Sequence, residues 1–253
     1  MTDEADVPVG DHYFAEHPRA RSHRTELRFL YRGEMLSFQV DTGVFAGHGL
    51  DRGTALLIEN MVVGVRDRAL DLGCGWGAVG IAAAKSANEG HAVLSDVNRR
   101  AVLLARRNLE RNTILNAEVR VGSLFAAVEG ERFDVIATNP PYHAGRPLIL
   151  QLLAEAPAHL REGGRFFIVG KGSQGIRFYQ AWLEAHWPGT VEVVARGSGY
   201  RVLEAVVRSS PGLPSAVGTL PVRRGTPLPE RGDGIHAMGS RRKVRPPETP
   251  RSA

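Results

Sequence analysis

Apolar residues recur along the central part of this 253-residue chain as short continuous runs that alternate with longer amphipathic stretches. Strands of a parallel sheet are buried on both faces and therefore have nearly continuous apolar sequence, whereas the connecting helices follow a period of 3.6 residues. This rhythm predicts an α/β fold with a doubly wound sheet. The expected strands are 69–72, 91–95, 117–121, 133–138 and 165–170, and the expected helices are 77–87, 98–112, 147–161 and 174–186.

Further strands are predicted on both sides of this region. An N-terminal β-hairpin alternates apolar and polar residues around a glycine-containing turn, and the last two strands are joined so tightly that we expect them to be antiparallel. The hairpin strands are 26–30 and 35–40 with the turn at 32–33, and the final pair is 190–195 and 200–207 with the turn at 197–199. Between hairpin and sheet, Asp51 is the expected N-cap of a helix that runs to about Met61.

Charge and proline are distributed unevenly. The chain is 43% hydrophobic and 23% charged with a net charge of +5, which provides enough apolar sequence for one folded core. Residues 211–253 carry eight Arg or Lys against three acidic residues, together with eight of the fifteen prolines, so the body of the chain is neutral. We expect a flexible basic segment over 1–23, a folded domain over 24–209 and a disordered tail rich in Pro and Arg over 210–253. The basic run 241–245 either adds phosphate contacts or belongs to a dispensable extension.

Composition also excludes several classes of protein. Cys74 is the single cysteine, so an intramolecular disulfide is ruled out, and no cluster of His and Cys offers a metal site. No apolar run approaches the roughly 20 residues of a membrane span, and the acidic start at residues 2–6 differs from a signal peptide. We therefore expect a soluble cytoplasmic protein without a metal or a membrane partner.

A glycine-rich turn follows the first expected strand of the sheet. Residues 71–80 read Asp-Leu-Gly-Cys-Gly-Trp-Gly-Ala-Val-Gly; such glycines let the backbone approach a ligand, and the following helix start offers free N–H groups. The spacing matches a dinucleotide-binding motif, but Asp71 would repel a pyrophosphate and favour an ammonium or sulfonium ligand. Asp96 ends the next strand, where it can accept hydrogen bonds from ribose hydroxyls.

Asn139-Pro140-Pro141-Tyr142 follows the apolar run 133–138. Residues before proline are held in an extended conformation, so the side-chain oxygen of Asn139 and the carbonyl of Pro140 form two acceptors in a stiff frame. Such a pair suits a group with two N–H donors, either an exocyclic base amine or a side-chain amide. Tyr142 offers a ring on which a flipped base can stack, a contact worth roughly 1–3 kcal/mol. Taken alone, the tetrapeptide also fits a rigid loop exit with a partly buried tyrosine.

Together these motifs resemble those of class I S-adenosylmethionine-dependent methyltransferases. The glycine-rich turn is similar to the family's first motif, Asp96 to the acidic end of its second strand, and residues 139–142 to its amino-methylating fourth motif. The segments 42–45, 50–54, 139–145 and 199–203 further resemble the small-domain ribosomal RNA guanine-N2-methyltransferases, over about residues 24–207. The resemblance implies a Rossmann-like, seven-stranded class I methyltransferase fold with an N-terminal β-hairpin extension that covers the cofactor edge. Well-known bacterial members carry a degenerate second domain ahead of this one, and we expect a single-domain form here.

The resemblance also implies roles for individual residues, with S-adenosyl-L-methionine as the cofactor. The implied catalytic residues are Asn139, Pro140 and Tyr142, and the implied cofactor-binding residues are Thr42, Gly43, Asp71, Gly73, Gly75, Gly77, Asp96, Val97, Gly122, Ser123 and Asn139. The implied substrate contacts are Pro141, Tyr142, His143, Arg146 and Lys171. For Ser123 an ordinary turn, for His143 a loop-ordering hydrogen bond, and for Arg146 and Lys171 a solvated surface remain the alternatives.

The function implied by the resemblance is methylation of the exocyclic N2 amine of a guanine in ribosomal RNA, with 16S rRNA favoured and ribosomal RNA or a ribosomal subunit as the partner. Three alternatives stay open from the residues alone. A glutamine amide of a release factor and the N6 amine of adenine present the same pair of N–H donors. A cofactor-binding but inactive RNA scaffold is the alternative outside the enzymes.

Overall fold

The structure of the chain is a computed structural model that describes residues 24–41 and 50–208. The predictions for the segments 1–23 and 210–253, and for Thr42 and Gly43, concern residues outside these ranges. The strands are β1 (Arg24–Tyr31), β2 (Glu34–Asp41), β3 (Arg68–Leu72), β4 (His91–Asp96), β5 (Ala117–Val121), β6 (Phe133–Thr138), β7 (Leu160–Lys171), β8 (Gly189–Gly197) and β9 (Tyr200–Val207). The α-helices are α1 (Arg52–Asn60), α2 (Ala78–Ser86), α3 (Arg99–Arg111), α4 (Arg146–Glu155) and α5 (Ile176–His186).

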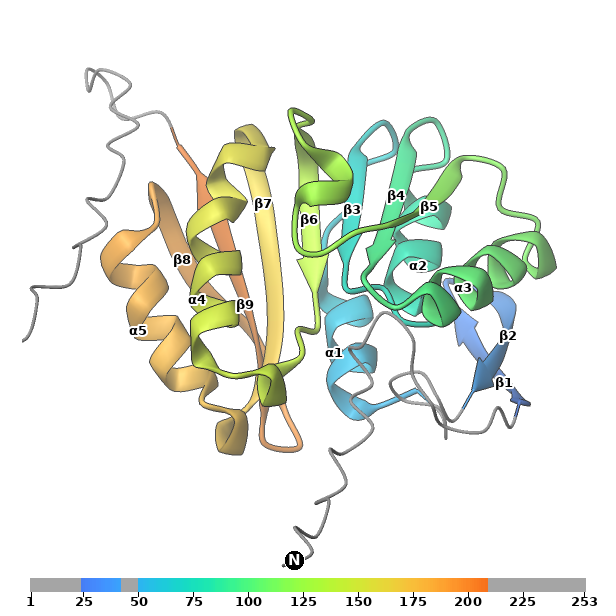
Figure 1. Cartoon of the computed structure of the whole chain (residues 1–253), viewed down its shortest axis with the longest axis horizontal. Coiled ribbons are helices and arrows are strands. Elements are labelled where there is room, and N and C mark those ends of the chain that lie inside the picture. The colour runs from blue at the N-terminus through green and yellow to red at the C-terminus, as the bar shows by residue number, and fades with distance from the viewer. Residues whose placement is uncertain (1–23, 42–49, 209–253) are drawn as a thin grey trace, which may run out of the picture. The chain divides into compact units, whose positions relative to one another are not determined.

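A seven-stranded sheet in the order β5-β4-β3-β6-β7-β9-β8 forms the centre of the described domain (Figure 1). The strands β5, β4, β3, β6 and β7 run parallel to one another, and β9 is antiparallel to both of its neighbours. This arrangement confirms the predicted Rossmann-like α/β fold and the antiparallel final pair. The carboxyl ends of the parallel strands therefore lie along one edge of the sheet, where doubly wound folds bind their ligands.

Helices cover both faces of this sheet. One apolar cluster packs α1, α2 and α3 on the first face, and a second packs α4 and α5 on the other; in Figure 1, α4 lies in front of the sheet and α2 behind it. The neighbouring residues Phe166 and Phe167 of β7 are both 0% exposed. Since successive strand side chains point to opposite faces, this pair shows that β7 is covered on both faces.

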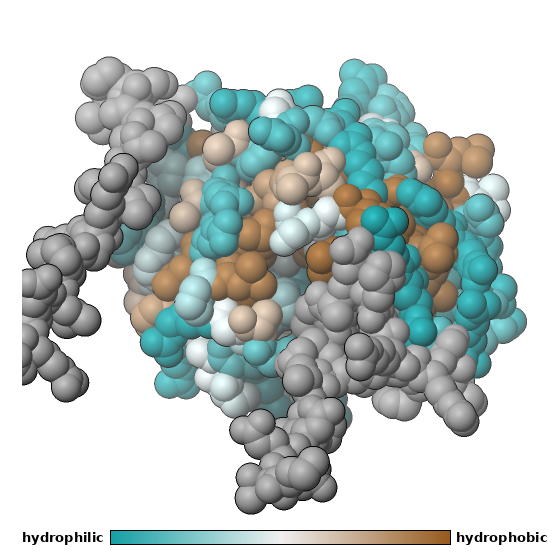
Figure 2. Space-filling model, viewed as in Figure 1, coloured by the Kyte–Doolittle hydropathy of each residue, from teal (hydrophilic) through white to brown (hydrophobic). Residues whose placement is uncertain are grey.

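The exterior of the described domain is mixed. On the face shown in Figure 2, hydrophilic residues follow the rim, and apolar residues gather toward the middle. None of the helices within residues 24–41 and 50–208 is long and apolar enough to cross a membrane.

The N-terminal hairpin forms as predicted but packs on helices. Its strands pair in register from Arg24 opposite Asp41 to Tyr31 opposite Glu34, and Asn108 of α3 both donates to and accepts from the backbone of Gln39. We expected this hairpin to cover the cofactor edge of the sheet. It lies instead on α2 and α3, and it approaches the glycine-rich turn through the edge-on contact between Phe38 and Trp76, whose ring centres are 4.9 Å apart.

The boundary between α4 and β7 differs from the prediction. A single helix was expected over 147–161, but α4 ends at Glu155, a 3₁₀ turn follows over Ala156–His159, and β7 begins at Leu160. Pro157 has no N–H to continue the helix, and Leu160 pairs with Phe133 of β6. The strand therefore starts five residues earlier than its apolar run indicates.

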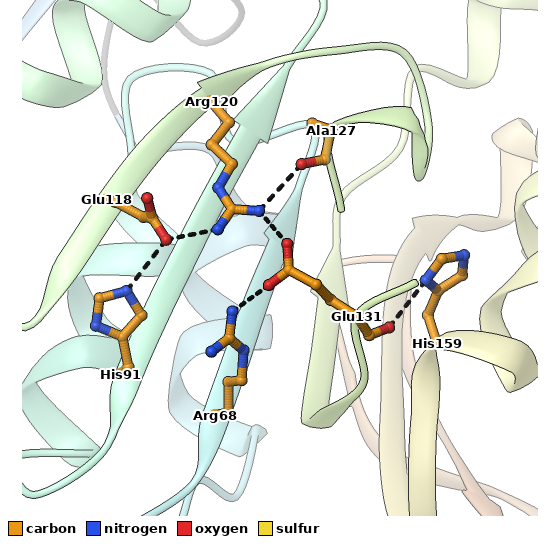
Figure 3. A network of polar contacts seen from close by, with 7 residues as sticks. All are labelled: Arg68, His91, Glu118, Arg120, Ala127, Glu131 and His159. Carbon is orange, nitrogen blue, oxygen red and sulfur yellow. Dashed lines mark hydrogen bonds and ion pairs between the residues drawn. The ribbon is translucent and has the colours of Figure 1, made fainter. Parts of the chain in front are cut away.

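A network of ion pairs joins the strands near the opposite, amino-terminal edge of the sheet (Figure 3). Glu131, just before β6, holds the guanidinium groups of Arg68 and Arg120, and Arg120 also donates to Glu118 at 2.7 Å. His91 lies 3.5 Å from the Glu118 carboxylate. Each such pair contributes little by itself, but together the pairs connect β3, β4, β5 and the turn before β6 through their side chains.

Candidate active site

The carboxyl ends of β3, β4, β5 and β6 surround a cavity of about 240 Å³. Leu72 ends β3, Asp96 ends β4, Gly122 and Ser123 follow β5, and Asn139 follows β6, so four strands that are distant in sequence contribute to one site. The cavity is lined by Leu72, Gly73, Gly75, Ser95, Asp96, Val97, Asn98, Ala101, Gly122, Ser123, Leu124, Thr138, Asn139, Pro141, Ala144, Leu148 and Leu152. A smaller cavity of about 30 Å³ adjoins it and is lined by Thr54, Asp71, Gly73, Cys74, Gly75, Trp76, Ala78, Val79 and Asn139.

The glycine-rich turn between β3 and α2 forms the floor shared by the two cavities. Gly73 has a φ of 77°, and a Cβ built on it meets no atom within 4 Å, so its backbone faces open space. The N–H groups of Gly73 and Cys74 both donate to the carbonyl of Ser95 at 2.9 Å. On the other side of the turn, a Cβ on Gly80 would lie 2.2 Å from Cγ of Leu94. The absence of side chains therefore brings α2 against β4 and leaves the turn accessible to a ligand.

Asp96 is held by backbone donors. One carboxylate oxygen accepts from the N–H of Gly75 at 2.8 Å, and the other accepts from the N–H of Asn98 at 2.8 Å. Burial raises the pKa of this carboxyl, and the backbone hydrogen bonds oppose that shift. The two carboxylate oxygens together offer about four acceptor directions, more than the three backbone donors Asn98, Gly75 and Val97 occupy, so Asp96 can still accept a hydrogen bond from a ligand hydroxyl. The adjoining Ser95 hydroxyl is buried without a hydrogen-bond partner among the described residues.

Asp71 lines the smaller cavity. It is 3% exposed, and its carboxylate accepts a hydrogen bond of 2.7 Å from the N–H of Gly80 in the first turn of α2. Burial raises the pKa of Asp71 from 3.8 to about 7, and repulsion by Asp96 adds to the shift. A nearby positive charge would lower this pKa again. The site therefore favours a cationic group beside Asp71.

The side chain of Asn139 is held by the first turn of α1. Its amide nitrogen donates to the hydroxyl of Thr54 at 2.9 Å and lies 3.4 Å from the carboxylate of Asp51. With the nitrogen engaged in this way, the side-chain oxygen is the group that can accept from a ligand. Asp51 is the N-cap of α1, as predicted, and accepts from the N–H groups of Gly53 and Thr54.

Pro140 and Tyr142 are more constrained than the sequence indicated. The carbonyl of Pro140 already accepts the N–H of Tyr142 at 2.9 Å. The hydroxyl of Tyr142 donates to the carbonyl of Val169 at 2.8 Å, and its ring lies 5.7 Å from that of Tyr179. Burial raises the pKa of Tyr142. The tyrosine is thus anchored against β7 and half-buried, so any stacking on it uses only the exposed part of its ring.

The remaining predicted substrate residues divide into two groups. Pro141 lines the larger cavity, whereas His143, Arg146 and Lys171 are exposed outside it. The guanidinium of Arg146 lies over the ring of Phe178 at 4.4 Å, and the ammonium of Lys171 lies over the ring of Tyr200 at 5.8 Å. Gly77 caps α2 with a φ of 93° and does not line either cavity. Thr42 and Gly43 lie outside the described residues.

Several lining residues are not predicted by the sequence. Ser95, Leu124 and Ala144 adjoin predicted residues and Leu148 lies two residues after Arg146, but nothing in the local sequence pattern marks any of them. Thr54 could have been found, because it stands three residues after an expected N-cap, where its hydroxyl can reach the capping carboxylate. Across the residues that the structure describes, no group of three or more His, Cys, Asp or Glu side chains is placed to hold a metal ion.

Comparison with protein families shows a match to the methyltransferase small domain over residues 35–204. The chain is 32% identical over 199 residues to "Uncharacterized protein YbxB" of Bacillus subtilis, which covers 78% of this chain and 98% of that protein. It is also 32% identical over 164 residues to "Ribosomal RNA small subunit methyltransferase C" of Haemophilus influenzae, covering 63% of this chain and 48% of that enzyme.

Among solved structures, the fold resembles that of the T. thermophilus 16S rRNA N2 G1207 methyltransferase in complex with AdoMet and guanosine. The TM-score is 0.64 at 28% identity, and the match covers 76% of this chain and 52% of that one. The ribosomal protein L11 methylase of Lactobacillus delbrueckii is similar with a TM-score of 0.52 at 25% identity, over 68% of this chain and 84% of that one. The chain thus spans about half the length of the ribosomal RNA methyltransferases that it matches.

Proposed function

Because this chain belongs to the methyltransferase small domain family, we propose that it is an S-adenosylmethionine-dependent methyltransferase acting on the N2 amine of a guanine in ribosomal RNA, 16S rRNA in the first place. The observation that carries the proposal is the orientation of Asn139. Its amide nitrogen is engaged by Thr54, so its oxygen is available to an amine at the meeting point of the two cavities.

The residues around the cavities fit S-adenosylmethionine. Asp96 can accept from the ribose hydroxyls, and the unpartnered Ser95 hydroxyl at the wall of the larger cavity is a buried donor that a ligand can satisfy. Gly122 and Ser123 line the larger cavity after β5 and would contact the adenine ring. Asp71, whose burial raises its pKa and favours a cationic neighbour, would hold the positively charged methionine end. When bound, the cofactor supplies an electrophilic methyl group on a positively charged sulfur.

The protein's own contribution is to position the amine. The lone pair of guanine N2 is delocalised into the ring, so hydrogen bonds from its two N–H groups to nearby acceptors favour a nitrogen that points its lone pair at the methyl group. Asn139 provides one acceptor through its side-chain oxygen. The carbonyl of Pro140 provides the other, because it accepts one hydrogen bond from the N–H of Tyr142 and has a second lone pair available. Proximity and orientation of this kind contribute up to about 7–11 kcal/mol of a reaction barrier.

The aromatic and cationic side chains beside the site support guanine in RNA as the substrate. A base must leave its stack to reach a buried cavity, at a cost of a few kcal/mol. The half-buried ring of Tyr142 and the exposed pair of Arg146 and Phe178 lie on the loop and helices next to Asn139, where an aromatic surface and a cation can hold a flipped nucleotide and its phosphate. The thermophilic structural neighbour was solved with guanosine bound, which agrees with this choice of base.

The proposal is tested by methyl transfer to a panel of acceptors. The protein is incubated with labelled S-adenosylmethionine and, in parallel, with undermethylated small ribosomal subunits, free 16S rRNA and release factors. We expect label in RNA. Label in a glutamine of a release factor would replace the proposed substrate by a protein amide, and the absence of transfer in every arm, with the cofactor bound, would favour an inactive scaffold.

Asn139→Ala provides the matching test of the site. We expect turnover to be nearly abolished while cofactor affinity, measured by calorimetry, stays within a few-fold of the parent protein, because the substituted amide faces the amine rather than the bulk of the cofactor. An equal loss of turnover and cofactor affinity would show that Asn139 serves the cofactor pocket instead.

A further inference from the structure

The first turn of α1 forms a hydrogen-bonded chain that ends at Asn139. Thr54 is 7% exposed, and its hydroxyl donates to one oxygen of the Asp51 carboxylate. The same hydroxyl accepts the amide nitrogen of Asn139 at 2.9 Å. The other oxygen of Asp51 accepts the N–H groups of Gly53 and Thr54 at 2.9 and 3.1 Å.

The number of hydrogen-bond donors among Asp51, Thr54 and Asn139 determines which way the Asn139 amide faces. A hydroxyl has a single proton, and a carboxylate can only accept. Because the Thr54 hydroxyl uses its proton in the hydrogen bond that it donates to Asp51, the Thr54 oxygen can only accept a further hydrogen bond. The group of Asn139 that faces it must therefore be the NH₂ group. The flipped amide would set two acceptor oxygens against each other and leave a buried polar group unpaired, which is strongly disfavoured.

The turn that carries Asp51 and Thr54 is itself fixed in place. Gly53 packs so closely on Tyr200 of β9 that an added Cβ would lie 2.7 Å from Cε1 of that ring. Leu57, one turn further along α1, is 0% exposed in the first apolar cluster. The hydroxyl that contacts Asn139 is therefore carried by a tightly packed helix turn.

We infer that Thr54, directed by Asp51, is a positioning residue that locks the Asn139 amide with its oxygen toward the substrate amine. The inference rests on the proposed function, because it gives that oxygen its role as acceptor, but the orientation of the amide is a property of the protein alone. Thr54 itself does not touch the reacting atoms in this account. It acts through Asn139.

Three substitutions separate this role from a merely structural one. Thr54→Val keeps the shape of the side chain and removes the hydroxyl, Thr54→Ser restores it, and Asp51→Asn keeps a good N-cap while placing an NH₂ donor against the Thr54 oxygen. In Asp51→Asn the Thr54 proton is free to point at Asn139, which favours the flipped amide. Ser86→Ala is the matched control, since it removes another buried hydroxyl, bonded to Tyr31 and to the backbone of α2.

Kinetics on small ribosomal subunits give the first readout. We expect Thr54→Val and Asp51→Asn to lower kcat roughly 10- to 100-fold, the loss typical of a misplaced catalytic group, with the KM for S-adenosylmethionine within a few-fold of the parent. Thr54→Ser and Ser86→Ala should stay near the parent rate. In an Asn139→Ala background, Thr54→Val should bring no further loss. Additive losses there, or equal losses in Thr54→Ser and Thr54→Val, would overturn the positioning role.

The second readout needs no activity. The side-chain NH₂ signals of Asn139 are assigned in a ¹⁵N NMR spectrum from their absence in Asn139→Ala. In the parent protein and in Thr54→Ser one amide proton should exchange slowly with solvent, and in Thr54→Val and Asp51→Asn it should exchange faster or shift. Unchanged signals in both of the latter variants would overturn the inference. Changed signals without methyl transfer to any RNA would uphold the orientation and reject the proposed function.

Discussion

Asp71→Asn tests the electrostatics of the site most sharply. Asp71 is 3% exposed and accepts a hydrogen bond of 2.7 Å from Gly80, and burial raises its pKa from 3.8 to about 7. Asparagine has nearly the same shape, and its side-chain oxygen can accept the same hydrogen bond. The substitution therefore removes the titrating group and its charge while it preserves the contact.

The magnitude follows from the difference between the folded and unfolded pKa values. Below about pH 4 the carboxyl is protonated in both states, and between pH 4 and 7 the unfolded chain loses this proton first, so the free energy of unfolding falls as the pH rises. With about 3 pKa units at 1.36 kcal/mol each, the protein above pH 7 is less stable by roughly 4 kcal/mol than it would be with a protonated carboxyl. The asparagine variant does not titrate here, although its buried NH₂ group costs about 1–3 kcal/mol at every pH.

The assay is denaturant unfolding of the parent protein and of Asp71→Asn at intervals from pH 4 to pH 8. At pH 4 the variant should be less stable than the parent. As the pH rises, the difference in their free energies of unfolding should shift in favour of the variant, by up to about 4 kcal/mol at pH 8. Calorimetry at pH 8 should show affinity for S-adenosylmethionine reduced about tenfold or more, since a cationic ligand loses its carboxylate partner. A stability difference that is constant across this pH range would refute the reasoning on Asp71.

The packing and surface predictions can be tested by unfolding as well. Gly80→Ala should lower the free energy of unfolding by roughly 1–3 kcal/mol, because its Cβ would lie 2.2 Å from Cγ of the buried Leu94. Gly172→Ala, whose Cβ would have its nearest atom 3.9 Å away, should change stability by less than about 0.5 kcal/mol. Equal effects would contradict the close approach of α2 to β4. Glu131→Gln should cost about 1 kcal/mol at low salt and less at 1 M salt. Since the hydrogen bond from Arg120 lowers the pKa of Glu131, that contribution should also fade as the pH drops below about 4.5, and a loss independent of salt and pH would point to packing instead.

The strands of the sheet could be predicted from the sequence, because a strand that is buried on both faces has a nearly continuous apolar run. Phe166 and Phe167 need opposite apolar layers, and Asp71 and Asp96 stand at strand ends whose meeting at one edge follows from parallel pairing. The boundary at Leu160 was harder to predict. Its position depends on pairing with Phe133 of β6, a long-range contact that no local period contains.

The side-chain chemistry of the site was predicted only in part. Asn139 was identified from its prolines, which constrain the local backbone. Its orientation depends on Thr54, which is 85 residues away in sequence, and the anchoring of Tyr142 depends on the carbonyl of Val169. Such contacts follow from how α1 and β7 pack on β6. Residue type alone marks a candidate group, but packing decides which of its atoms faces the ligand.

The most direct test of the central claim is nucleoside analysis by mass spectrometry of 16S rRNA after reaction of undermethylated small subunits with the protein and S-adenosylmethionine. We expect N2-methylguanosine at one position, formed by the parent protein and lost in Asn139→Ala. N6-methyladenosine in its place, or N2-methylguanosine formed equally well without Asn139, would contradict the central claim.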